Sequence, residues 1–387
     1  MRTFTVTGQT PKPAKHKPVA NNCNRKKEHV EISRTTDVEA KLSAGWADIH
    51  LIHQCLPEID RADIDLTANF CGRKVNYPLV ISALTGGFPE AAEINRTLGK
   101  VARHFGLILE IGSQRPMLVQ PEMAATYLAA RKAAPDVLLV ANIGAGQLIS
   151  QKDSPALTLS QIKKLVAAIK ADALAIHLNF LQESVMPEGD RHARGCMEAI
   201  GRVAQSLSIP VIVKETGAGI SRTQALQLRS QGVAALEVGG AGGTSMALVE
   251  SIRAASHNDQ FFQRLGQTFG SWGLPTAVSI IEAKASQLPV IATGGIRSGL
   301  DAAKALALGA DLVGMARPIL IEVSSGGYQG TVKFLEGFFE ELAIAMFLVG
   351  ATNINELKQK SLVITGDTRD WLEQLGYDMP RLAECRV

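Results

Sequence analysis

Short apolar runs rich in β-branched residues alternate with longer segments of helical periodicity from about residue 77 onward. Apolar residues are nearly continuous within each run, which indicates parallel strands that are covered on both faces. Eight such strand–helix units predict an α/β fold of the TIM (β/α)8 barrel type rather than an open sheet. The expected strands are residues 79–83, 107–111, 137–141, 173–177, 211–214, 234–238, 290–293 and 311–315, and the clearest expected helices are 91–105, 159–171, 223–231 and 300–308.

Polar and glycine residues follow every one of these runs. The carboxyl ends of barrel strands meet at one face, and barrel enzymes place their active sites there. Eight polar loops in phase therefore predict a site at this face. The segments are residues 84–87, 112–115, 142–146, 177–183, 214–217, 239–245, 293–299 and 314–318.

Four regions follow from this pattern. Residues 1–24 carry lysines among prolines and are expected to form a disordered basic extension. Residues 25–76 read as an N-terminal arm and lead-in, 77–350 as the barrel, and 351–387 as a C-terminal extension with a short helix near Trp371. Within the barrel, residues 246–275 form a long excursion before the seventh strand, which is typical of a lid or binding element.

Composition narrows the class of protein. The chain has 387 residues, 46% hydrophobic and 20% charged, with a formal net charge of +3. This is ordinary globular composition, and the charge is too small to imply nucleic acid. No stretch of about 20 apolar residues predicts a membrane span, and the run at 342–349 reads as a buried helix. Five scattered cysteines without a C-x-x-C pair fit a reducing cytosol and no structural zinc.

The end of the fourth expected strand concentrates polar groups. His177 and Asn179 alternate with Leu178, so they point to the same side, and Gln182 and Glu183 follow at once. This set could form an acid–base relay or a ligand clamp. A carboxylate and an amide beside a phosphorylated ligand are the usual setting for Mg²⁺, although Glu183 could also be a plain helix-entry glutamate.

The seventh and eighth loops, 293–299 and 314–317, predict a phosphate site, because glycines and a helix start admit an anion closely; a tight turn without ligand is the alternative. Lys214 ends an apolar strand and has three interpretations. It could form a Schiff base, stabilise negative charge on a flavin ring, or extend to the rim. Glu215 and Glu237 also end strands and remain acid–base candidates.

Arg25, Lys26 and His29 stand in a charged run that by itself predicts only a solvated surface. Arg115 already supplies a cation at the barrel mouth. A diphosphate recruits several such groups, so the basic arm could fold over the mouth and cover a substrate.

Together these motifs resemble the type II, flavin-dependent isopentenyl-diphosphate delta-isomerases, from about residue 25 to about residue 350. The specific part is Arg-Lys-x-x-His at 25–29 together with His-Leu-Asn-x-x-Gln-Glu at 177–183, whereas the glycine loops are shared with other FMN barrels. Three features depart from the family pattern. Phe180 stands where proline is common, Thr216 to Gly219 replace a bulkier residue after Lys214, and the extension before Arg25 is long.

The resemblance implies an isomerase that interconverts isopentenyl and dimethylallyl diphosphate by a 1,3-proton shift. It implies FMN that is active when reduced, Mg²⁺ on the diphosphate, NADPH as reductant, a cytoplasmic homo-oligomer (tetramer or octamer), and no nucleic-acid or membrane partner. FMN would be held by Ala83, Leu84, Thr85, Ser113, Asn142, Lys214, Thr244, Gly295, Ile296, Arg297, Ala316 and Arg317. The diphosphate substrate would face Arg25, Lys26, His29, Ser113, Gln114, Arg115, His177, Asn179 and Gln182; Glu183 would bind the metal, and Gln182, Lys214 and His177 would act in catalysis.

Three other classes share parts of this pattern. An FMN-dependent 2-hydroxy-acid oxidase or dehydrogenase would need a histidine after the sixth strand, where this chain has none before His257. A lysine-dependent aldolase would use Lys214. A non-catalytic flavin- or phosphate-binding barrel would have no need of Glu183, His177 and Arg115 together.

Overall fold

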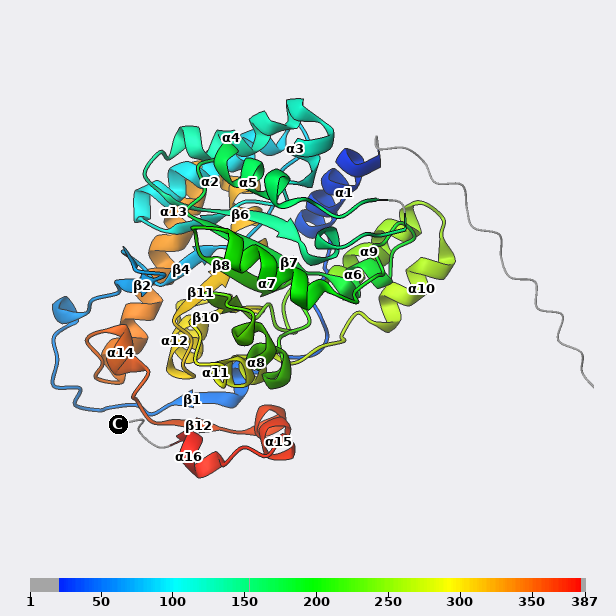
Figure 1. Ribbon diagram of the computed structural model, residues 1–387. Helices are drawn as coiled ribbons and strands as arrows, with labels where there is room; N and C mark the ends of the chain where they lie inside the picture. The colour runs from blue at the N-terminus through cyan, green and yellow to red at the C-terminus, as the bar shows by residue number, and fades with distance from the viewer. Residues whose placement is uncertain (1–20, 153, 384–387) are drawn as a thin grey trace, which may run out of the picture.

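The computed structural model describes residues 21–152 and 154–383, and in this part of the chain eight parallel strands close into a barrel (Figure 1). The order around the barrel is β10-β11-β4-β5-β6-β7-β8-β9, so neighbours in the chain are neighbours in space. Every strand falls on a predicted run, which confirms the predicted fold class. The strands are β4 (Leu79–Ile81), β5 (Ile108–Glu110), β6 (Leu138–Gly144), β7 (Ala173–Leu178), β8 (Val211–Glu215), β9 (Ala235–Glu237), β10 (Val290–Thr293) and β11 (Leu312–Met315).

Helices cover the outside of the barrel. The predicted helix at 91–105 matches α2 at both ends, and the other predicted helices match to within a few residues. The apolar run at 342–349 lies at the end of α13 with Leu342 and Met346 buried, as predicted. The outer helices are α2 (Ala91–Phe105), α4 (Ala124–Ala133), α5 (Leu159–Ala168), α7 (Cys196–Ser206), α8 (Arg222–Ser230), α11 (Thr276–Lys284), α12 (Gly299–Ala307) and α13 (Arg317–Leu348), which breaks at Gly327.

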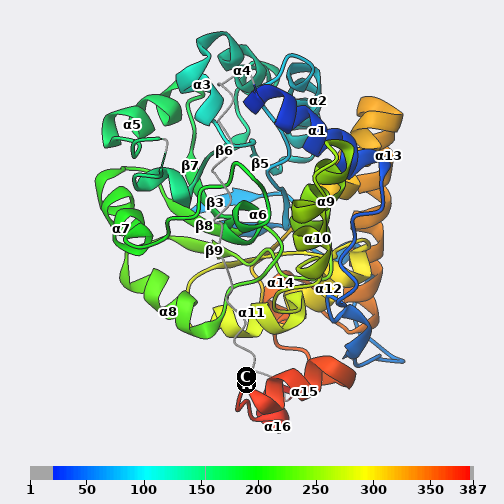
Figure 2. The same cartoon turned by 90° about the vertical axis from the view of Figure 1, so that its right-hand side faces the viewer.

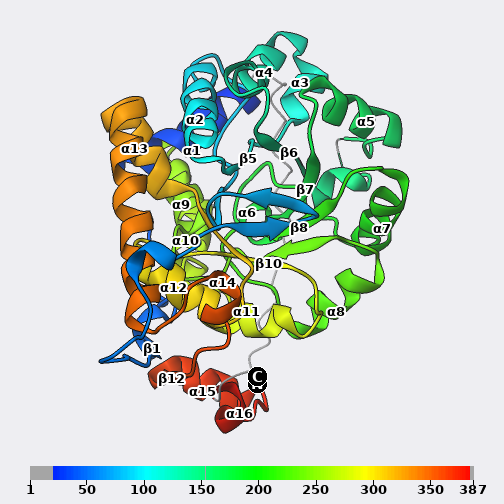
Figure 3. The same ribbon diagram turned by 90° about the vertical axis from the view of Figure 1, so that its left-hand side faces the viewer.

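A small hairpin closes the amino end of the barrel. It consists of β2 (Ala68–Phe70) and β3 (Arg73–Val75), joined by Cys71 and Gly72, both at positive φ, as a two-residue hairpin turn requires. Phe70 and Val75 pack among the inward-facing residues of the strands. The blue hairpin lies across this end in Figure 3. Because this end is plugged, a ligand can enter only from the carboxyl ends of the strands.

Several short elements gather around the open end (Figure 2). They are α1 (Asn21–Thr35), α3 (Arg115–Val119), η3 (Pro121–Met123), η4 (Ala145–Leu148), α6 (Phe180–Ser184), α9 (Met246–Ser256) and α10 (Gln260–Thr268). The long excursion at 246–275 thus forms two helices, and α9 packs against both α1 and α6. The predicted disordered extension lies largely outside the described residues, and α1 begins at Asn21.

The lead-in segment and the C-terminal extension pair with each other outside the barrel. Strand β1 (Ile49–Leu51) runs antiparallel to β12 (Leu362–Ile364). Trp371 lies in α15, as expected. The remaining elements are η1 (Trp46–Asp48), η2 (Arg61–Asp63), α14 (Ile354–Leu357), α15 (Gly366–Gln374) and α16 (Met379–Ala383). Among the described residues, no helix combines the length and apolar character that crossing a membrane requires.

Candidate active site

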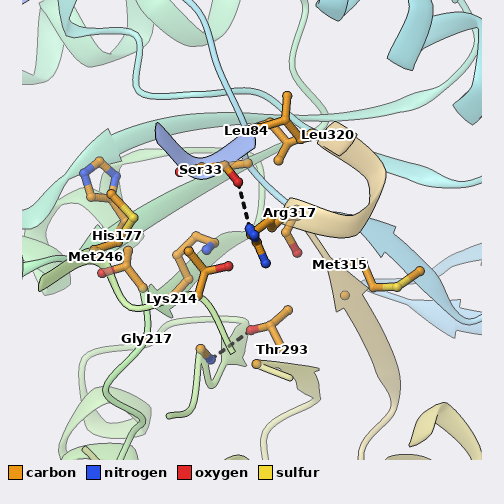
Figure 4. Close-up of a pocket in the computed structure, with 18 of the residues that line it drawn as sticks. Ser33, Leu84, His177, Lys214, Gly217, Met246, Thr293, Met315, Arg317 and Leu320 are labelled. Carbon is orange, nitrogen blue, oxygen red and sulfur yellow. Dashed lines mark hydrogen bonds between the residues drawn. The ribbon is translucent and has the colours of Figure 1, made fainter. Parts of the chain in front are cut away.

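A cavity of about 300 Å³ opens at the carboxyl ends of the strands (Figure 4). Residues from all the barrel loops contribute to its lining. A pocket of this size is within the range of small-molecule and cofactor sites. Its walls include all twelve residues predicted to hold the cofactor: Ala83, Leu84, Thr85, Ser113, Asn142, Lys214, Thr244, Gly295, Ile296, Arg297, Ala316 and Arg317.

One end of this cavity has the features of an anion site. Helices α12 and α13 both begin here, and helix starts favour negative charge. Gly295 has φ 69°, and a Cβ at this position would lie 2.6 Å from the carbonyl oxygen of Gly242. Only glycine therefore lets the two loops approach so closely.

Glu39 holds both arginines at this end. Each of its carboxylate oxygens lies 2.7 Å from Arg297 Nη2, and Oε1 lies 2.5 Å from Arg317 Nη1. Arg317 also donates through Nε to the carbonyl oxygen of Ser33 at 2.7 Å. The two guanidinium groups thus fasten the segment after α1 to the barrel. No local signal in the sequence marks Glu39 as a site residue, because its partners lie 258 and 278 residues away.

Lys214 lies buried in the cavity wall, with Nζ 3.2 Å from Glu237 Oε1. Burial alone lowers the pKa of a lysine, but the charges of Glu237 and Glu110 outweigh it and raise the pKa of Lys214. A Schiff-base lysine needs a depressed pKa to supply a neutral amine. The electrostatics of this site therefore favour a fixed cation and argue against the aldolase reading.

His177 is neutral in this cavity. Burial, followed by the charges of Lys214 and Lys26, lowers its pKa to about 3. Its Nδ1 lies 2.6 Å from Asn142 Oδ1, so in the neutral ring Nδ1–H donates and Nε2 is the acceptor. The parallel register places His177 beside Lys214, and Lys214 beside Glu237.

A second cavity of about 130 Å³ joins the first. The two share Lys26, His29, Ser113, His177 and Gln182 in their walls. Eight of the nine residues predicted to face substrate line the second cavity, namely Arg25, Lys26, His29, Ser113, Arg115, His177, Asn179 and Gln182. The N-terminal arm therefore does fold over the mouth, where α1 contributes three of these side chains.

The second cavity is lined by three fixed cations, Arg25, Lys26 and Arg115, and by three acidic side chains, Glu183, Glu188 and Asp190. Lys26 Nζ donates to the carbonyl oxygen of Ser113 at 2.6 Å and to the hydroxyl of Tyr127 at 3.1 Å. Arg115 Nη1 lies 3.1 Å from Asp190. Three fixed cations at one cavity can donate charge-assisted hydrogen bonds to a polyanion.

Gln114 is a correction to the predicted substrate set. Its side chain is fully buried and lines neither cavity. Its Nε2 donates to the carbonyl oxygen of Leu165 at 3.1 Å, and its Oε1 accepts from the backbone N–H of Asn142 at 3.2 Å. Both ends of the amide thus bind backbone groups behind β6, and Gln114 holds Asn142 in place from there.

Glu183 lies at the far side of the second cavity. Its Oε1 accepts from Asn179 Nδ2 at 2.8 Å and its Oε2 from the backbone N–H of Asp190 at 2.7 Å. Burial is the main influence on its carboxyl group and raises its pKa. A Cβ at Gly189 would lie 1.7 Å from the carbonyl oxygen of Glu183, so only glycine allows the chain to bring the Asp190 N–H this close.

No group of three His, Cys, Asp or Glu side chains suited to a metal ion occurs in the described part of the chain. Among the described residues, Glu183 therefore does not belong to a set of three such ligands. Mg²⁺ commonly binds in this way, with one or two carboxylates, substrate phosphates and water completing its octahedron. The donor set fits a metal that arrives with its substrate.

Helix α9 supplies a charged cluster that the sequence analysis did not single out. Gln182 Nε2 donates to Glu250 Oε1 at 2.7 Å, and Arg253 Nε donates to Glu250 Oε2 at 2.7 Å. His29 Nε2 lies 2.8 Å from Glu250 Oε1, an ion-pair contact whose N–H is poorly aligned. Burial raises the pKa of Glu250, but His29 and Arg253 outweigh it, and the pKa falls below its usual range.

The small residues after Lys214 have a structural reason. Glu215 accepts three backbone N–H groups with one oxygen, from Thr216 at 2.7 Å, Gly217 at 2.9 Å and Ala218 at 2.6 Å. A chain that wraps so tightly around a carboxylate needs small side chains. Burial, offset by these hydrogen bonds, raises the pKa of Glu215 to about 7.

Besides Glu237 Oε2 and His29 Nε2, two buried polar atoms on residues that line these cavities have no hydrogen-bond partner among the described residues. They are Thr85 Oγ1 in the first cavity and Gln147 Oε1 in the second. Unsatisfied buried polar atoms are costly, and a polar ligand would satisfy them. Together with the anion site and the fixed cation of Lys214, they fit a phosphorylated, hydrogen-bonding cofactor such as FMN.

Known proteins resemble this chain over most of its length. Residues 115–364 match the model of the FMN-dependent dehydrogenase family. The isopentenyl-diphosphate delta-isomerase of Methanothermobacter thermautotrophicus is 44% identical over 93% of this chain and 98% of its own. That of Thermococcus kodakarensis is 46% identical over 92% of this chain and 95% of its own.

Solved structures show the same barrel at low identity. A lactate oxidase of Pediococcus acidilactici superimposes with a TM-score of 0.58, 17% identity and 87% coverage of each chain. A mandelate oxidase variant carrying an FMN adduct gives 0.54, with 18% identity, covering 87% of this chain and 92% of its own. At these identities the likeness concerns the fold alone.

The fold and site define a flavin-dependent barrel of the FMN-dependent dehydrogenase class. Within that class, the chain belongs to the isopentenyl-diphosphate delta-isomerase family, in its flavin-dependent form, which confirms the resemblance drawn from the motifs.

Proposed function

We propose that the protein interconverts isopentenyl and dimethylallyl diphosphate by a 1,3-proton shift, with FMN in its reduced form, NADPH as reductant and Mg²⁺ on the diphosphate. One observation carries this proposal. A cavity suited to a flavin joins a second cavity whose cations could bind a diphosphate, and His177 and Gln182 stand in the walls of both. A prenyl chain between them would reach from one to the other.

The residues that would hold FMN lie in three places. The loops at 293–299 and 314–317 would take the phosphate, Thr85 and Asn142 would bind the polar groups of the flavin, and Lys214 would supply a fixed positive charge. Reduced FMN, when bound, supplies the group that exchanges the proton with the alkene. A buried cation favours the anionic form of such a ring.

The remaining residues bind substrate and exclude water. Arg25, Lys26 and Arg115 would hold the diphosphate, and α1 would cover it. Protonating an unactivated alkene creates a cation that water would trap, so a covered site is required. Gln182 would orient the prenyl group, because Glu250 fixes its amide at 2.7 Å. Glu183 would ligate Mg²⁺, with Asn179 and the Asp190 N–H holding its carboxylate in place.

The alternative function, a 2-hydroxy-acid oxidase, would need a histidine after the sixth strand as its catalytic base. His257 lies at the end of α9, half-exposed, with Nε2 3.1 Å from Glu28, and lines neither cavity. His177 is neutral, but it hydrogen-bonds to Asn142 rather than to a carboxylate that would increase its basicity. Assembly into a homo-oligomer and a cytoplasmic location stay predictions.

The test is an anaerobic assay of isopentenyl-to-dimethylallyl conversion in D₂O with the purified flavoprotein. We expect conversion and deuterium incorporation only after the flavin is reduced with dithionite or NADPH. Equal turnover with oxidised flavin would contradict the role given to reduced FMN. Oxidation of lactate or mandelate, without isomerisation, would favour the oxidase instead.

A further inference from the structure

Glu110 and Glu237 are two buried carboxyl groups that the proposed reaction does not use. They lie on β5 and β9, on different sides of the barrel, and their exposed fractions are 1% and 0%. Each has one occupied oxygen. Glu237 Oε1 accepts from the Ser82 hydroxyl at 3.0 Å and lies 3.2 Å from Lys214 Nζ, and Glu110 Oε2 accepts from the backbone N–H of Ala83 at 3.2 Å.

The second oxygen of each carboxyl group is also buried. Glu110 Oε1 and Glu237 Oε2 are buried and have no hydrogen-bond partner among the described residues. The two carboxyl groups lie within hydrogen-bonding reach of each other. As two carboxylates they would repel, and the protein would leave one buried oxygen of each unsatisfied. One proton between them gives each oxygen a partner, as in other paired carboxyl groups.

Burial, more than the surrounding charges, favours keeping that proton. Lys214 on β8 is the cation beside it, and Glu215 at the end of the same strand adds a carboxylate near Lys214. His177 on β7 is neutral, and Ser82 after β4 contributes only a hydroxyl. Burial and the Glu237 charge hold the pKa of Glu110 well above its ordinary value, although Lys214 acts in the opposite direction.

We propose that Glu110 and Glu237 share one proton, so that the pair balances Lys214 with a single negative charge beside the flavin. This inference rests on the proposed placement of the flavin against Lys214. With the proton in place, Lys214 and the pair sum to zero charge, so the lysine is balanced by one carboxylate and not by two. Once the proton is lost, the cluster carries one net negative charge. An anionic reduced flavin is then less favourable, and the reduction potential of the bound cofactor falls.

The first test detects the proton itself. Infrared spectra of the full-length flavoprotein at neutral pH should show the carbonyl stretch of a protonated carboxyl group in the wild type. Glu215, whose pKa is about 7, also contributes to this band, so the variants are compared by difference spectra. The wild type minus Glu110→Gln should show a protonated-carboxyl band, and the wild type minus Glu122→Gln, a control at an exposed glutamate, should not. A Glu110→Gln variant whose band is as strong as that of the wild type would overturn the proposal. Titration of the wild type needs no variant to fold, and part of its band should persist well above pH 7, where Glu215 has lost its proton; a band that disappears wholly around pH 7 would also overturn the proposal.

The second test measures the potential of bound FMN against pH by dye equilibration. Glutamine mimics the neutral carboxyl, so Glu110→Gln should match the wild type at neutral pH. At high pH the reduction potential of the wild type should lie about 30 mV below that of the variant. For a two-electron couple this corresponds to about a tenfold lower ratio of reduced to oxidised flavin. Parallel curves at all pH values, or a variant potential already raised at neutral pH, would contradict the shared proton. Isomerase turnover is assayed separately, so failure of the proposed function leaves the infrared result intact.

Discussion

The side-chain amide of Gln182 and the carboxylate of Glu250 form a 2.7 Å hydrogen bond that joins α6 to α9. His29 of α1 contacts the same carboxylate oxygen at 2.8 Å. Three elements that are far apart in the chain thus meet at one buried carboxylate beside the junction of the two cavities. The excursion before the seventh strand is therefore part of the candidate site, and its Glu250 holds Gln182, the residue proposed to orient substrate.

Replacing Glu250 tests this arrangement. Glu250→Gln keeps the size of the side chain but removes the charge that holds His29 and Arg253. Misplacing an orienting group by about 1 Å costs on the order of 10²-fold in rate, so we expect kcat/KM to fall by that order. Bound flavin should be retained, as absorbance will show. Glu198→Gln, at an exposed position of α7, is the matched control, and an unchanged kcat/KM in Glu250→Gln would refute the role.

Glu183→Gln should separate metal binding from cofactor binding. The amide can still accept from Asn179 or from the Asp190 N–H, but it lacks the negative charge that Mg²⁺ prefers. We expect the Mg²⁺ concentration that gives half-maximal activity to rise about 10- to 100-fold, with the flavin spectrum unchanged. Measuring rates across a Mg²⁺ titration checks this. Loss of the yellow cofactor from this variant would show that the assignment is wrong.

Gly189→Ala should disturb the same carboxylate through the backbone. The added Cβ would meet the Glu183 carbonyl oxygen at 1.7 Å, so the chain must shift and the Asp190 N–H must move away from Glu183. Overpacking of this kind costs about 1–3 kcal/mol in the free energy of unfolding. Denaturant unfolding and kcat/KM measure the two effects. The control is Gly337→Ala on the exposed face of α13, where a Cβ meets nothing within 4 Å and should stabilise by about 0.5–1 kcal/mol. Equal stabilities of the two variants would argue against the close approach.

The lowered pKa of His177 predicts that the folded protein becomes less stable in acid. Its pKa is about 3 in the folded protein and ordinarily 6.5, so between these values the unfolded chain binds more protons. The free energy of unfolding should therefore fall as the pH drops from about 6.5 towards 3, by up to about 1.4 kcal/mol per pH unit from this residue. His177→Gln should show a shallower decline over that window in urea unfolding. Identical slopes for the two proteins would mean that His177 titrates normally.

Local pattern was enough to predict much of this protein. All eight strands were predictable because parallel barrel strands are buried on both faces and read as continuous apolar runs. The twelve residues predicted to hold the cofactor lie at or shortly after the ends of those runs, so closing the barrel brings them together whatever the details of packing. Gln114 was misplaced for the opposite reason. It lies in a motif whose neighbours Ser113 and Arg115 face the cavity, and only the turn of the backbone there directs it towards Leu165.

By itself the sequence determined the barrel, its working face and the chemical types that line it, because strand periodicity and loop position are local properties of the chain. Only the tertiary structure decided which charges meet. Glu39 reaches Arg297 and Arg317, Glu250 reaches Gln182, and Glu110 lies across the barrel from Glu237. These contacts join residues tens to hundreds of positions apart. Their distances, and the pKa values that follow from them, depend on how the barrel closes and on what is excluded from water when it does.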